Sequence, residues 1–246
     1  MGRGTEKNKM TDLSKAKHLH FQSLDSTNSY AKFIADQEAK PFIVTADYQL
    51  QGRGRLGNNW HSIAGGIYYS LVIHLGHFPF KSVHYPFLIS LAVYHFLENY
   101  ISSGLFLKWP NDVLINKKKI AGILQEQAGR NLVIGIGINI NQDPSQIDAK
   151  KETVSLAKLC NRSFDTHELI AELTHQIDNE INQYNKNPDQ LFSDVKQLYQ
   201  SLNSIITCRI GSVEKRGRFI DLGKNGELLL ETANGVEAIY AAEIIE

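Results

Sequence analysis

The sequence predicts an α+β fold: a mixed, mostly antiparallel sheet flanked by helices, followed by a small β-barrel at the C-terminus. Three successive strand patterns between Leu105 and Ile140 are separated by breaks short enough for hairpins, which favours antiparallel pairing. The segments 85–100 and 169–181 carry apolar residues at helical spacing. From Ser204 onward, short strand patterns alternate with glycine-containing turns, as in small β-barrels.

The N-terminal part of the chain predicts a strand, a helix and two further strands. Apolar residues between 19 and 24 indicate a short strand, and the polar residues 25–28 are good helix caps. The helix that follows should bury an apolar face formed by Tyr30, Phe33 and Ile34. The segment 42–46 is rich in β-branched residues and predicts a buried strand, and 67–75 predicts another. We expect the polar residues 1–18 to be flexible.

The second half of the chain predicts two more helices and the barrel. Within the sheet, the three strand patterns occupy residues 105–115, 119–127 and 132–140. Asp165 followed by Glu168 resembles a capping box, and a further helix is expected at about 189–202. The barrel turns are expected at Gly211, Gly217, Lys224-Asn225-Gly226 and Asn234-Gly235. The main body therefore covers residues 1–202 and the small β module residues 203–246.

The composition is that of an ordinary globular protein. The 246 residues include 26 Lys or Arg and 26 Asp or Glu, so no bulk charge attracts nucleic acid or a membrane surface. The two cysteines, Cys160 and Cys208, lack metal-ligand spacing and suit a reducing cytosol. No apolar run approaches a membrane span, and residues 1–9 lack a signal-peptide core. We therefore expect a cytoplasmic protein that binds neither DNA nor membranes.

The segment from Gly52 to Gly57 matches the pattern G-x-G-x-x-G of dinucleotide-binding folds. That interpretation requires a helix to begin there, because a helix N-terminus binds the pyrophosphate. Residues 58–62 show no helical periodicity, and the acidic residue expected about twenty positions further on is missing. A nicotinamide-dependent oxidoreductase is therefore the least favoured function.

Arg53 and Arg55, in the same loop, favour a different function. Glycines let the backbone approach a ligand closely, and guanidinium groups are forked, permanently charged donors suited to phosphate. A loop of this composition could become ordered over an anionic ligand. The alternative, a solvated flexible turn with incidental charge, stays open on the loop alone.

Three other residues or pairs stand out from apolar strands. Lys108 has almost wholly apolar neighbours, where a lysine is costly to bury without an anionic partner; a lysine that reaches solvent from a strand end is the commoner case. Lys119 begins the next strand, after two lysines that favour a solvated turn. Gly135 and Gly137 share one face of a strand, which leaves room for a ligand or for a helix that crosses closely.

Taken in order, these segments are similar to the biotin–protein ligase family, of the monofunctional type that lacks a DNA-binding domain. The matching segments are Ser26-Thr27-Asn28, Tyr48-Gln49, Gly52-Arg53-Gly54-Arg55, Trp60, Lys108-Trp109-Pro110-Asn111-Asp112, Lys119 to Ile123 and Gly135 to Asn139. The ordered set is far more specific than any one motif. The resemblance implies a catalytic domain at 1–202, similar to class II synthetases, and an SH3-like domain at 203–246.

The resemblance also implies a reaction. The family joins biotin to ATP as biotinyl-5′-AMP, then transfers biotin to a lysine of the biotin carboxyl carrier protein of acetyl-CoA carboxylase or another carboxylase. Mg²⁺ is expected at the phosphates. Its protein ligand stays open, with Asp112 as a candidate, although a structural role in the turn is favoured for this residue.

The resemblance assigns residues to three roles. The catalytic residues are Arg53, Arg55 and Lys108. The residues implied to bind biotin are Ser26, Thr27, Asn28, Gln49, Gly52, Arg53, Gly54, Arg55, Trp60, Lys108, Gly135 and Gly137. Those implied to bind ATP are Arg53, Arg55, Trp60, Lys108, Asn111, Lys119 and Asn139. The polar residues before the helix should bond the ureido group, the strand glycines should leave space for the bicyclic ring, and the tryptophan should cover apolar ligand surface.

Two other functions stay open: a lipoate or octanoate ligase or transferase of the same fold, and a non-catalytic biotin sensor. Many members of the family carry further basic residues in the glycine-rich loop, where this chain has Leu56 and Asn58. Twenty residues precede Phe21, too few for the DNA-binding domain of bifunctional members, so no operator binding is expected. Both a monomer and a homodimer are compatible with the sequence.

Overall fold

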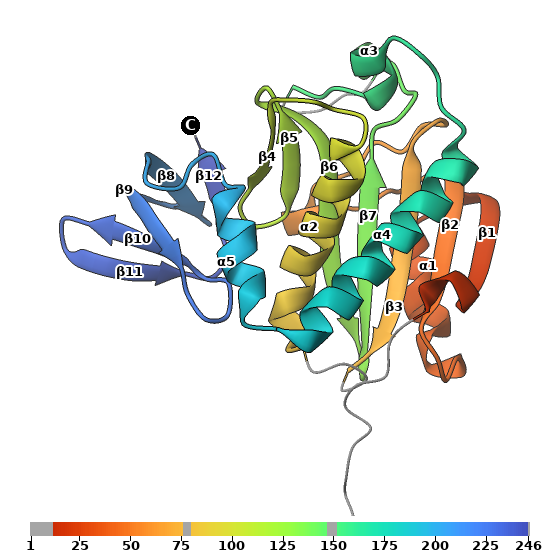
Figure 1. The fold of residues 1–246 in the computed structure, drawn as a ribbon, viewed down its shortest axis with the longest axis horizontal. Coiled ribbons are helices and arrows are strands. Elements are labelled where there is room, and N and C mark those ends of the chain that lie inside the picture. The colour runs from red at the N-terminus through yellow and green to blue at the C-terminus, as the bar shows by residue number, and fades with distance from the viewer. Residues whose placement is uncertain (1–11, 76–79, 147–151, 246) are drawn as a thin grey trace, which may run out of the picture.

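The computed structural model describes residues 12–75, 80–146 and 152–245. Its centre is a seven-stranded sheet with the order β1-β2-β3-β7-β6-β5-β4 (Figure 1). The strands are β1 Lys17–Leu24, β2 Phe42–Gln49, β3 Ile67–His74, β4 Leu105–Lys108, β5 Asp112–Ile115, β6 Lys118–Ala128 and β7 Asn131–Ile138. Only β1 and β2 pair in parallel, and the other neighbours are antiparallel. The prediction of a mixed, mostly antiparallel sheet is confirmed.

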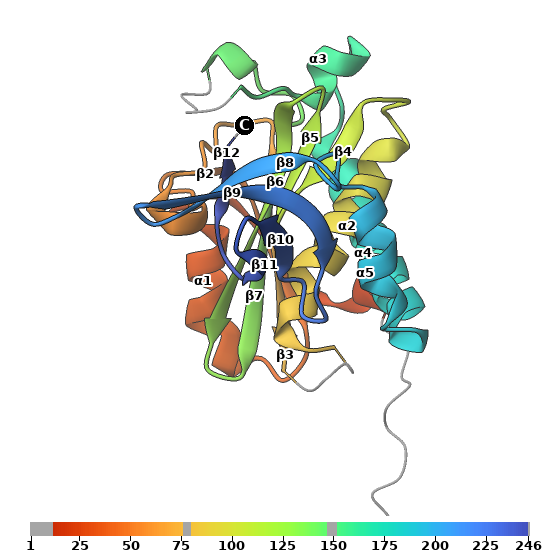
Figure 2. The same ribbon diagram turned by 90° about the vertical axis from the view of Figure 1, so that its left-hand side faces the viewer.

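Helices cover both faces of this sheet. Figure 2 shows α1 on one side and α2, α4 and α5 on the other. The helices are α1 Thr27–Ile34, α2 Tyr85–Glu98, α3 Leu156–Cys160, α4 Thr166–Lys186 and α5 Gln190–Gln197. Strand alternation divides the core accordingly: Val133 packs in a cluster with residues of α1, and Ile134 in the larger cluster with residues of α2 and α4. Among the described residues, no helix combines the length and apolar character needed to cross a bilayer.

The capping residues named from the sequence lie where they were expected. The Ser26 side chain accepts a hydrogen bond from the Ser29 amide at the start of α1. Asp165 accepts from the amides of His167 and Glu168 at the start of α4. Each cap satisfies amides that have no partner within the helix, which fixes where α1 and α4 begin.

A second, wholly antiparallel sheet follows, with the order β11-β10-β9-β8-β12. Its strands are β8 Ile205–Ile210, β9 Val213–Leu222, β10 Leu228–Thr232, β11 Gly235–Ile239 and β12 Glu243–Ile245. This sheet agrees with the predicted SH3-like module. It lies beside α5 (Figure 1), and Trp109 of the main body donates its indole N–H to the Gly226 carbonyl at 3.0 Å. The module is therefore packed against the β4–β5 turn.

Three expectations for individual elements were wrong. The strand expected at 105–115 is two strands, because Trp109-Pro110-Asn111 forms a turn; Pro110 has no N–H to donate to a ladder. Phe33 is 77% exposed, whereas Ile34 of the same predicted face is buried, together with Ala31. The last helix ends at Gln197, because the next carbonyl, of Leu198, accepts from the Leu107 amide of β4.

One of the glycines expected in barrel turns lies elsewhere. Gly211, Gly226 and Gly235 have positive φ; the first two lie in turns, and Gly235 begins β11 directly after the turn at 233–234. Gly217 lies inside β9, where a Cβ would stand 2.4 Å from the Glu231 carbonyl oxygen of β10. A close approach of two backbones, and not a turn, requires glycine there.

The N-terminal segment that we expected to be flexible belongs in part to the fold. Residues 1–11 lie outside the described residues. The 3₁₀ turn Leu13–Lys15 and the start of β1 follow, and Leu13 is only 4% exposed. The Leu13 amide donates to Asp178 of α4 at 3.0 Å. Burial of one leucine against α4 therefore attaches this segment to the core.

We predict that Leu13→Ala lowers the free energy of unfolding by about 2–4 kcal/mol, because it removes a buried side chain and leaves a cavity. Equilibrium denaturation with urea measures this. Leu50→Ala, at a leucine that is 69% exposed, is the matched control and should change stability by less than about 0.5 kcal/mol. Equal effects of the two substitutions would show that Leu13 is not packed.

Candidate active site

A cavity of about 820 Å³ lies against the face of the sheet that carries α1. Its lining comes from the start of α1, the glycine-rich loop, the β4–β5 turn, β6 and β7, and the C-terminal module. Fourteen of the fifteen predicted site residues line it: Ser26, Thr27, Asn28, Gln49, Arg53, Gly54, Arg55, Trp60, Lys108, Asn111, Lys119, Gly135, Gly137 and Asn139. The chain thus brings together residues from distant segments, although their individual roles remain predictions.

Gly52 is the predicted residue that does not line this cavity. It borders a neighbouring hollow with Ser62. A Cβ at Gly52 would lie 2.3 Å from both Ser62 Oγ and the Trp60 carbonyl oxygen. Gly52 therefore lets the two ends of the loop approach each other, and the Trp60 amide donates to the Gly52 carbonyl at 2.9 Å.

A hydrogen-bond network holds the polar residues at the start of α1. Gln49 Oε1 accepts from the Thr27 amide at 2.8 Å and from the Thr27 hydroxyl at 3.1 Å. Gln49 Nε2 donates to Ser62 Oγ at 2.7 Å. Ser70 of β3 donates to Asn28 Oδ1 at 2.6 Å. Donors and acceptors at this end of the cavity are therefore held in fixed positions before a ligand arrives.

Sequence reasoning missed Ser62 and Ser70. Ser70 carried a signal, since it is a polar residue within the otherwise apolar run of β3, and it is fully buried. A buried hydroxyl needs a hydrogen-bond partner, so its position in the run could have indicated a polar site behind the strand. Ser62 carried no comparable signal.

The glycines on the cavity face of the sheet leave space that side chains occupy in this structure. A Cβ at Gly135 would lie 2.4 Å from Asn28 Oδ1, and one at Gly137 would lie 2.4 Å from the Trp60 indole. A Cβ at Gly122 of β6 would lie 2.9 Å from the same ring. The predicted space is present, but Asn28 and Trp60 lie directly over it. The Trp60 Nε1 atom is buried and has no hydrogen-bond partner in the described part of the chain.

Arg53 is held by an acidic residue that sequence reasoning missed. Glu126 of β6 lies 3.2 Å from Arg53 NH2 and 2.7 Å from Lys32 Nζ of α1, and Asn28 Nδ2 donates to it at 3.0 Å. Burial alone would raise the pKa of Glu126. Hydrogen bonds from Lys32 and Asn28 and the charges of Lys32 and Arg53 outweigh burial and lower this pKa overall. Glu126 therefore stays ionised and anchors the loop to the sheet.

Arg55 lies deeper. Its NH1 donates to Asn111 Oδ1 at 2.9 Å, and the Asn111 amide group in turn donates to the Ile123 carbonyl. Burial lowers the pKa of Arg55, and the nearby Asp112 carboxylate opposes this. Arginine stays charged under such shifts, so Arg55 presents a cation from a partly desolvated position.

Lys119 is fixed by two contacts. Its Nζ lies 2.7 Å from Asp112 Oδ1 and 5.1 Å from the centroid of the Trp60 ring. The second distance is within the range of a cation–π contact. Asp112 thus holds a cation at the cavity, a role that the sequence did not predict. Lys108, half-buried, lines the same wall and pairs with Asp112 in the β4–β5 register.

The C-terminal module contributes part of the wall. Arg209 of β8, Ala242, and Glu243 and Ile244 of β12 line the cavity. The side chains of the lining include five lysines or arginines and two carboxylates: Arg53, Arg55, Lys108, Lys119 and Arg209 against Asp112 and Glu243. The cavity is therefore suited to an anionic ligand. No motif in the sequence predicted that Arg209 would lie there.

Comparison with known proteins agrees with this geometry. The sequence profile of the Biotin/lipoate A/B protein ligase family matches residues 20–143. The chain is 31% identical to the bifunctional ligase/repressor BirA of Bacillus subtilis, over 92% of this chain and 73% of that protein. The chain belongs to this family. It is also 29% identical to the biotin–[acetyl-CoA-carboxylase] ligase of Paracoccus denitrificans, over 89% of this chain and 96% of the relative.

A solved structure of a family member has the same fold. Biotin protein ligase from Aquifex aeolicus, in complex with biotin and ATP, superposes with a TM-score of 0.82 at 26% identity, over 93% of this chain and 97% of that one. The predictions of the biotin–protein ligase family and of its fold are confirmed. The roles of the individual site residues in this chain stay predictions.

We predict that Gly137→Ala displaces Trp60, because the new methyl group would overlap the indole ring. Tryptophan emission should shift to the red and become more accessible to a quencher such as acrylamide. Gly135→Ala, which meets Asn28 instead, is the control and should leave the emission as in the wild type. Circular dichroism checks that both variants are folded. Identical quenching of the two variants would contradict the described position of Trp60.

Proposed function

We propose that this chain uses ATP to convert biotin into biotinyl-5′-AMP and then transfers biotin to a lysine of a biotin carboxyl carrier protein. The observation that carries the proposal is one cavity in which Arg53, Arg55 and Lys108 surround a space beside the polar network of α1. Family membership supports it, as do relatives named biotin–[acetyl-CoA-carboxylase] ligase and a neighbour solved with biotin and ATP.

The polar end of the cavity suits a cyclic urea. A ureido group has two N–H donors and one carbonyl acceptor, and it needs both kinds of partner when it is buried. Ser26, Thr27, Asn28 and Gln49 supply hydroxyl, amide and carbonyl groups whose positions are already fixed. Trp60 would cover the apolar part of the ligand from its position over the strand glycines.

In the first step, a biotin carboxylate oxygen attacks the α-phosphorus of ATP. The new O–P bond forms while the bond from the α-phosphorus to the bridging oxygen breaks, and pyrophosphate leaves. Two anions must approach, and negative charge builds on the phosphoryl oxygens. Arg53, Arg55 and Lys108 oppose this repulsion, and such fixed charges contribute about 3–4 kcal/mol each to transition-state stabilisation.

In the second step, the neutral amine of the carrier lysine attacks the biotinyl carbonyl carbon. The amide bond forms, the bond to AMP breaks, AMP leaves and the nitrogen loses a proton. The adenylate is a mixed anhydride that water also cleaves. Arg53 and Arg55 lie on the loop beside the cavity, and the link from Arg53 to Glu126 would keep this loop closed until the carrier arrives.

We further propose that Asn111, Lys119 and Asn139 contact the nucleotide. Asn139 is only 2% exposed and donates to the Lys119 carbonyl at 3.4 Å, so it supports Lys119 at the cavity wall. Mg²⁺ fits a site of this kind because it binds mainly through phosphate oxygens and water, with one or two carboxylates. Asp112 is the candidate carboxylate, since it lines the cavity beside Lys119. The metal would neutralise phosphate charge.

The domain assignment of 1–202 as catalytic and 203–246 as SH3-like is part of the same proposal. Arg209 and Glu243 of the second segment line the cavity, so the module would complete the site. The acceptor is proposed to be a carrier domain of acetyl-CoA carboxylase or of another carboxylase, the substrate that the names of the relatives indicate.

We predict biotin-dependent exchange of pyrophosphate into ATP, with no comparable exchange when lipoate replaces biotin. Lys108→Ala should lower kcat/KM for this exchange by about 10²–10³-fold, because it removes a cation from the developing charge. Lys117→Ala, at an exposed turn lysine, is the control and should match the wild type. Exchange supported by lipoate instead of biotin would assign the chain to another branch of the family.

We predict that Arg53→Ala releases the adenylate early, because the loop loses its ion pair with Glu126. The measurement is biotin attached to lysines of an unrelated bystander protein, together with free biotinyl-AMP after rapid filtration. Arg130→Ala, at an exposed arginine in the β6–β7 turn, should label the bystander no more than the wild type does. Equal retention of the adenylate by the Arg53 variant and the wild type would refute the gating role.

A further inference from the structure

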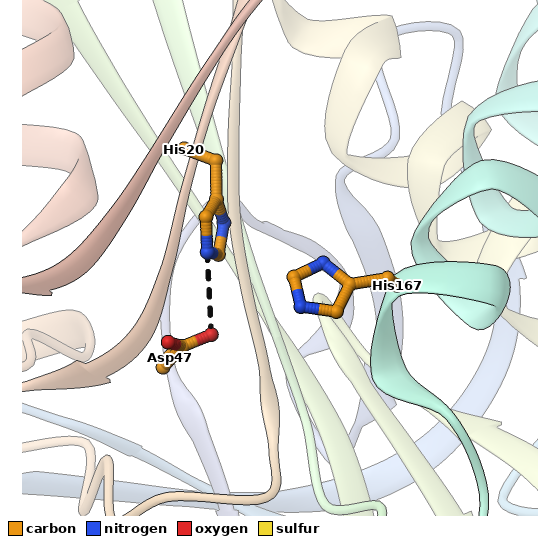
Figure 3. Close-up of side chains that lie close together, drawn as sticks. All are labelled: His20, Asp47 and His167. Carbon is orange, nitrogen blue, oxygen red and sulfur yellow. Dashed lines mark ion pairs between the residues drawn. The ribbon is translucent and has the colours of Figure 1, made fainter.

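Two histidines and an aspartate meet on the opposite face of the sheet from the cavity. His20 lies on β1, Asp47 on β2 and His167 in the first turn of α4. Figure 3 shows His20 and Asp47 joined by an ion-pair contact, with the ring of His167 reaching toward them from its helix. Ile43 lies four residues before Asp47 on β2, so the two side chains point to the same face of the sheet. Ile43 packs in the core cluster with residues of α2 and α4, and the histidine and aspartate cluster therefore faces away from α1.

The spacing of the three side chains suits a metal ion. Their ligand atoms all lie within 4.8 Å of one another, and His20 Nε2 stands 3.4 Å from Asp47 Oδ1. Two ligands bound to a tetrahedral zinc ion at bond lengths of 2.0–2.2 Å are about 3.3–3.5 Å apart. The first pair therefore already has the required separation. His167 offers the third ligand atom, within 4.8 Å of the other two.

The surrounding residues orient these ligands. Thr45 Oγ1 lies 3.0 Å from His20 Nδ1, on the side of the ring away from Asp47. Hydrogen bonding of one ring nitrogen is what commonly directs the other toward a metal. Asp165 accepts from the His167 amide at 2.8 Å, which fixes the start of α4 and the position from which His167 projects.

We propose that His20, Asp47 and His167 bind one zinc ion. Imidazole nitrogens and a carboxylate are typical zinc ligands, whereas Mg²⁺ prefers oxygen ligands and would not compete. The side chains of His20 and Asp47 are 35% and 42% exposed, so water can supply the fourth ligand. A plain ion pair between protonated His20 and Asp47 is the competing explanation of the same geometry.

The ion would have a structural role, distinct from the proposed ligase chemistry. It would join the edge strand β1 and its neighbour β2 to α4, elements that otherwise meet here through the edge-to-face contact of His20 and His167 rings at 4.9 Å. Because the ligands are far apart in the sequence, binding would stabilise the folded chain and not the unfolded one.

The test is zinc titration of the full chain, free of tags and treated with a chelator, in competition with a chromophoric chelator. We expect one zinc equivalent in the wild type, lost in His20→Ala and in His167→Ala. Asp47→Asn should weaken binding by more than the ~10-fold that loss of an outer-shell partner costs, because it removes the charge of a direct ligand. His175→Ala, at an exposed histidine of the same helix, should retain binding. With cobalt(II), the wild type should show the visible absorption of a tetrahedral site. His20→Ala and His167→Ala should not show it.

Stability provides a second measurement. At a zinc concentration of about 100 times Kd, the Tm of the wild type should rise by about 5 °C or more, and that of His167→Ala should not change. Far-UV circular dichroism checks that the variant is folded. The absence of a zinc equivalent in the wild type, or equal binding by the His167 and His175 variants, would overturn the proposal and leave the ion pair as the explanation.

Discussion

Repulsion between like charges is the constraint on which the architecture of the cavity depends. Three of its cations are held by a specific partner: Arg53 by Glu126 of β6, Arg55 by Asn111 of the β4–β5 turn and Lys119 by Asp112 of β5. Where water is partly excluded, such pairs interact more strongly than at an exposed surface. These partners fix the positions of three of the five lysines and arginines that line the cavity. Lysine and arginine side chains outnumber carboxylates in the lining, which suits an anionic ligand.

The sheet separates this polar wall from the apolar core. On β7, Gly135 and Gly137 face the cavity, while Ile134 and Ile136 face α2 and α4. This alternation lets one strand support ligand-binding space and core packing at once. The histidine and aspartate cluster lies on the other face of the sheet from the cavity. A ligand in the cavity and an ion at the cluster would therefore contact different side chains.

Much of the fold was predictable because it rests on local patterns. Apolar and polar alternation in strands, apolar periodicity in helices, and helix caps such as Ser26 and Asp165 depend on residues that are close in the sequence. The errors have local causes as well. Pro110 within an apolar run should have divided the predicted strand, and Phe33 satisfied the helical period although its side chain is exposed. Helical periodicity identifies the apolar face of a helix, but it does not show which residues of that face will be buried by neighbouring elements.

By itself, the sequence determined the fold class, the family and most of the residues named for the site that gather at the cavity, because the motifs occur in a specific order that few other folds share. The tertiary structure alone decided which partner holds each cation. It also decided that Trp60 lies over Gly137, that Arg209 of the C-terminal module reaches the cavity, and that His20 meets His167. These contacts join segments far apart in the chain, and they depend on how rigid elements pack against each other, which no local period encodes.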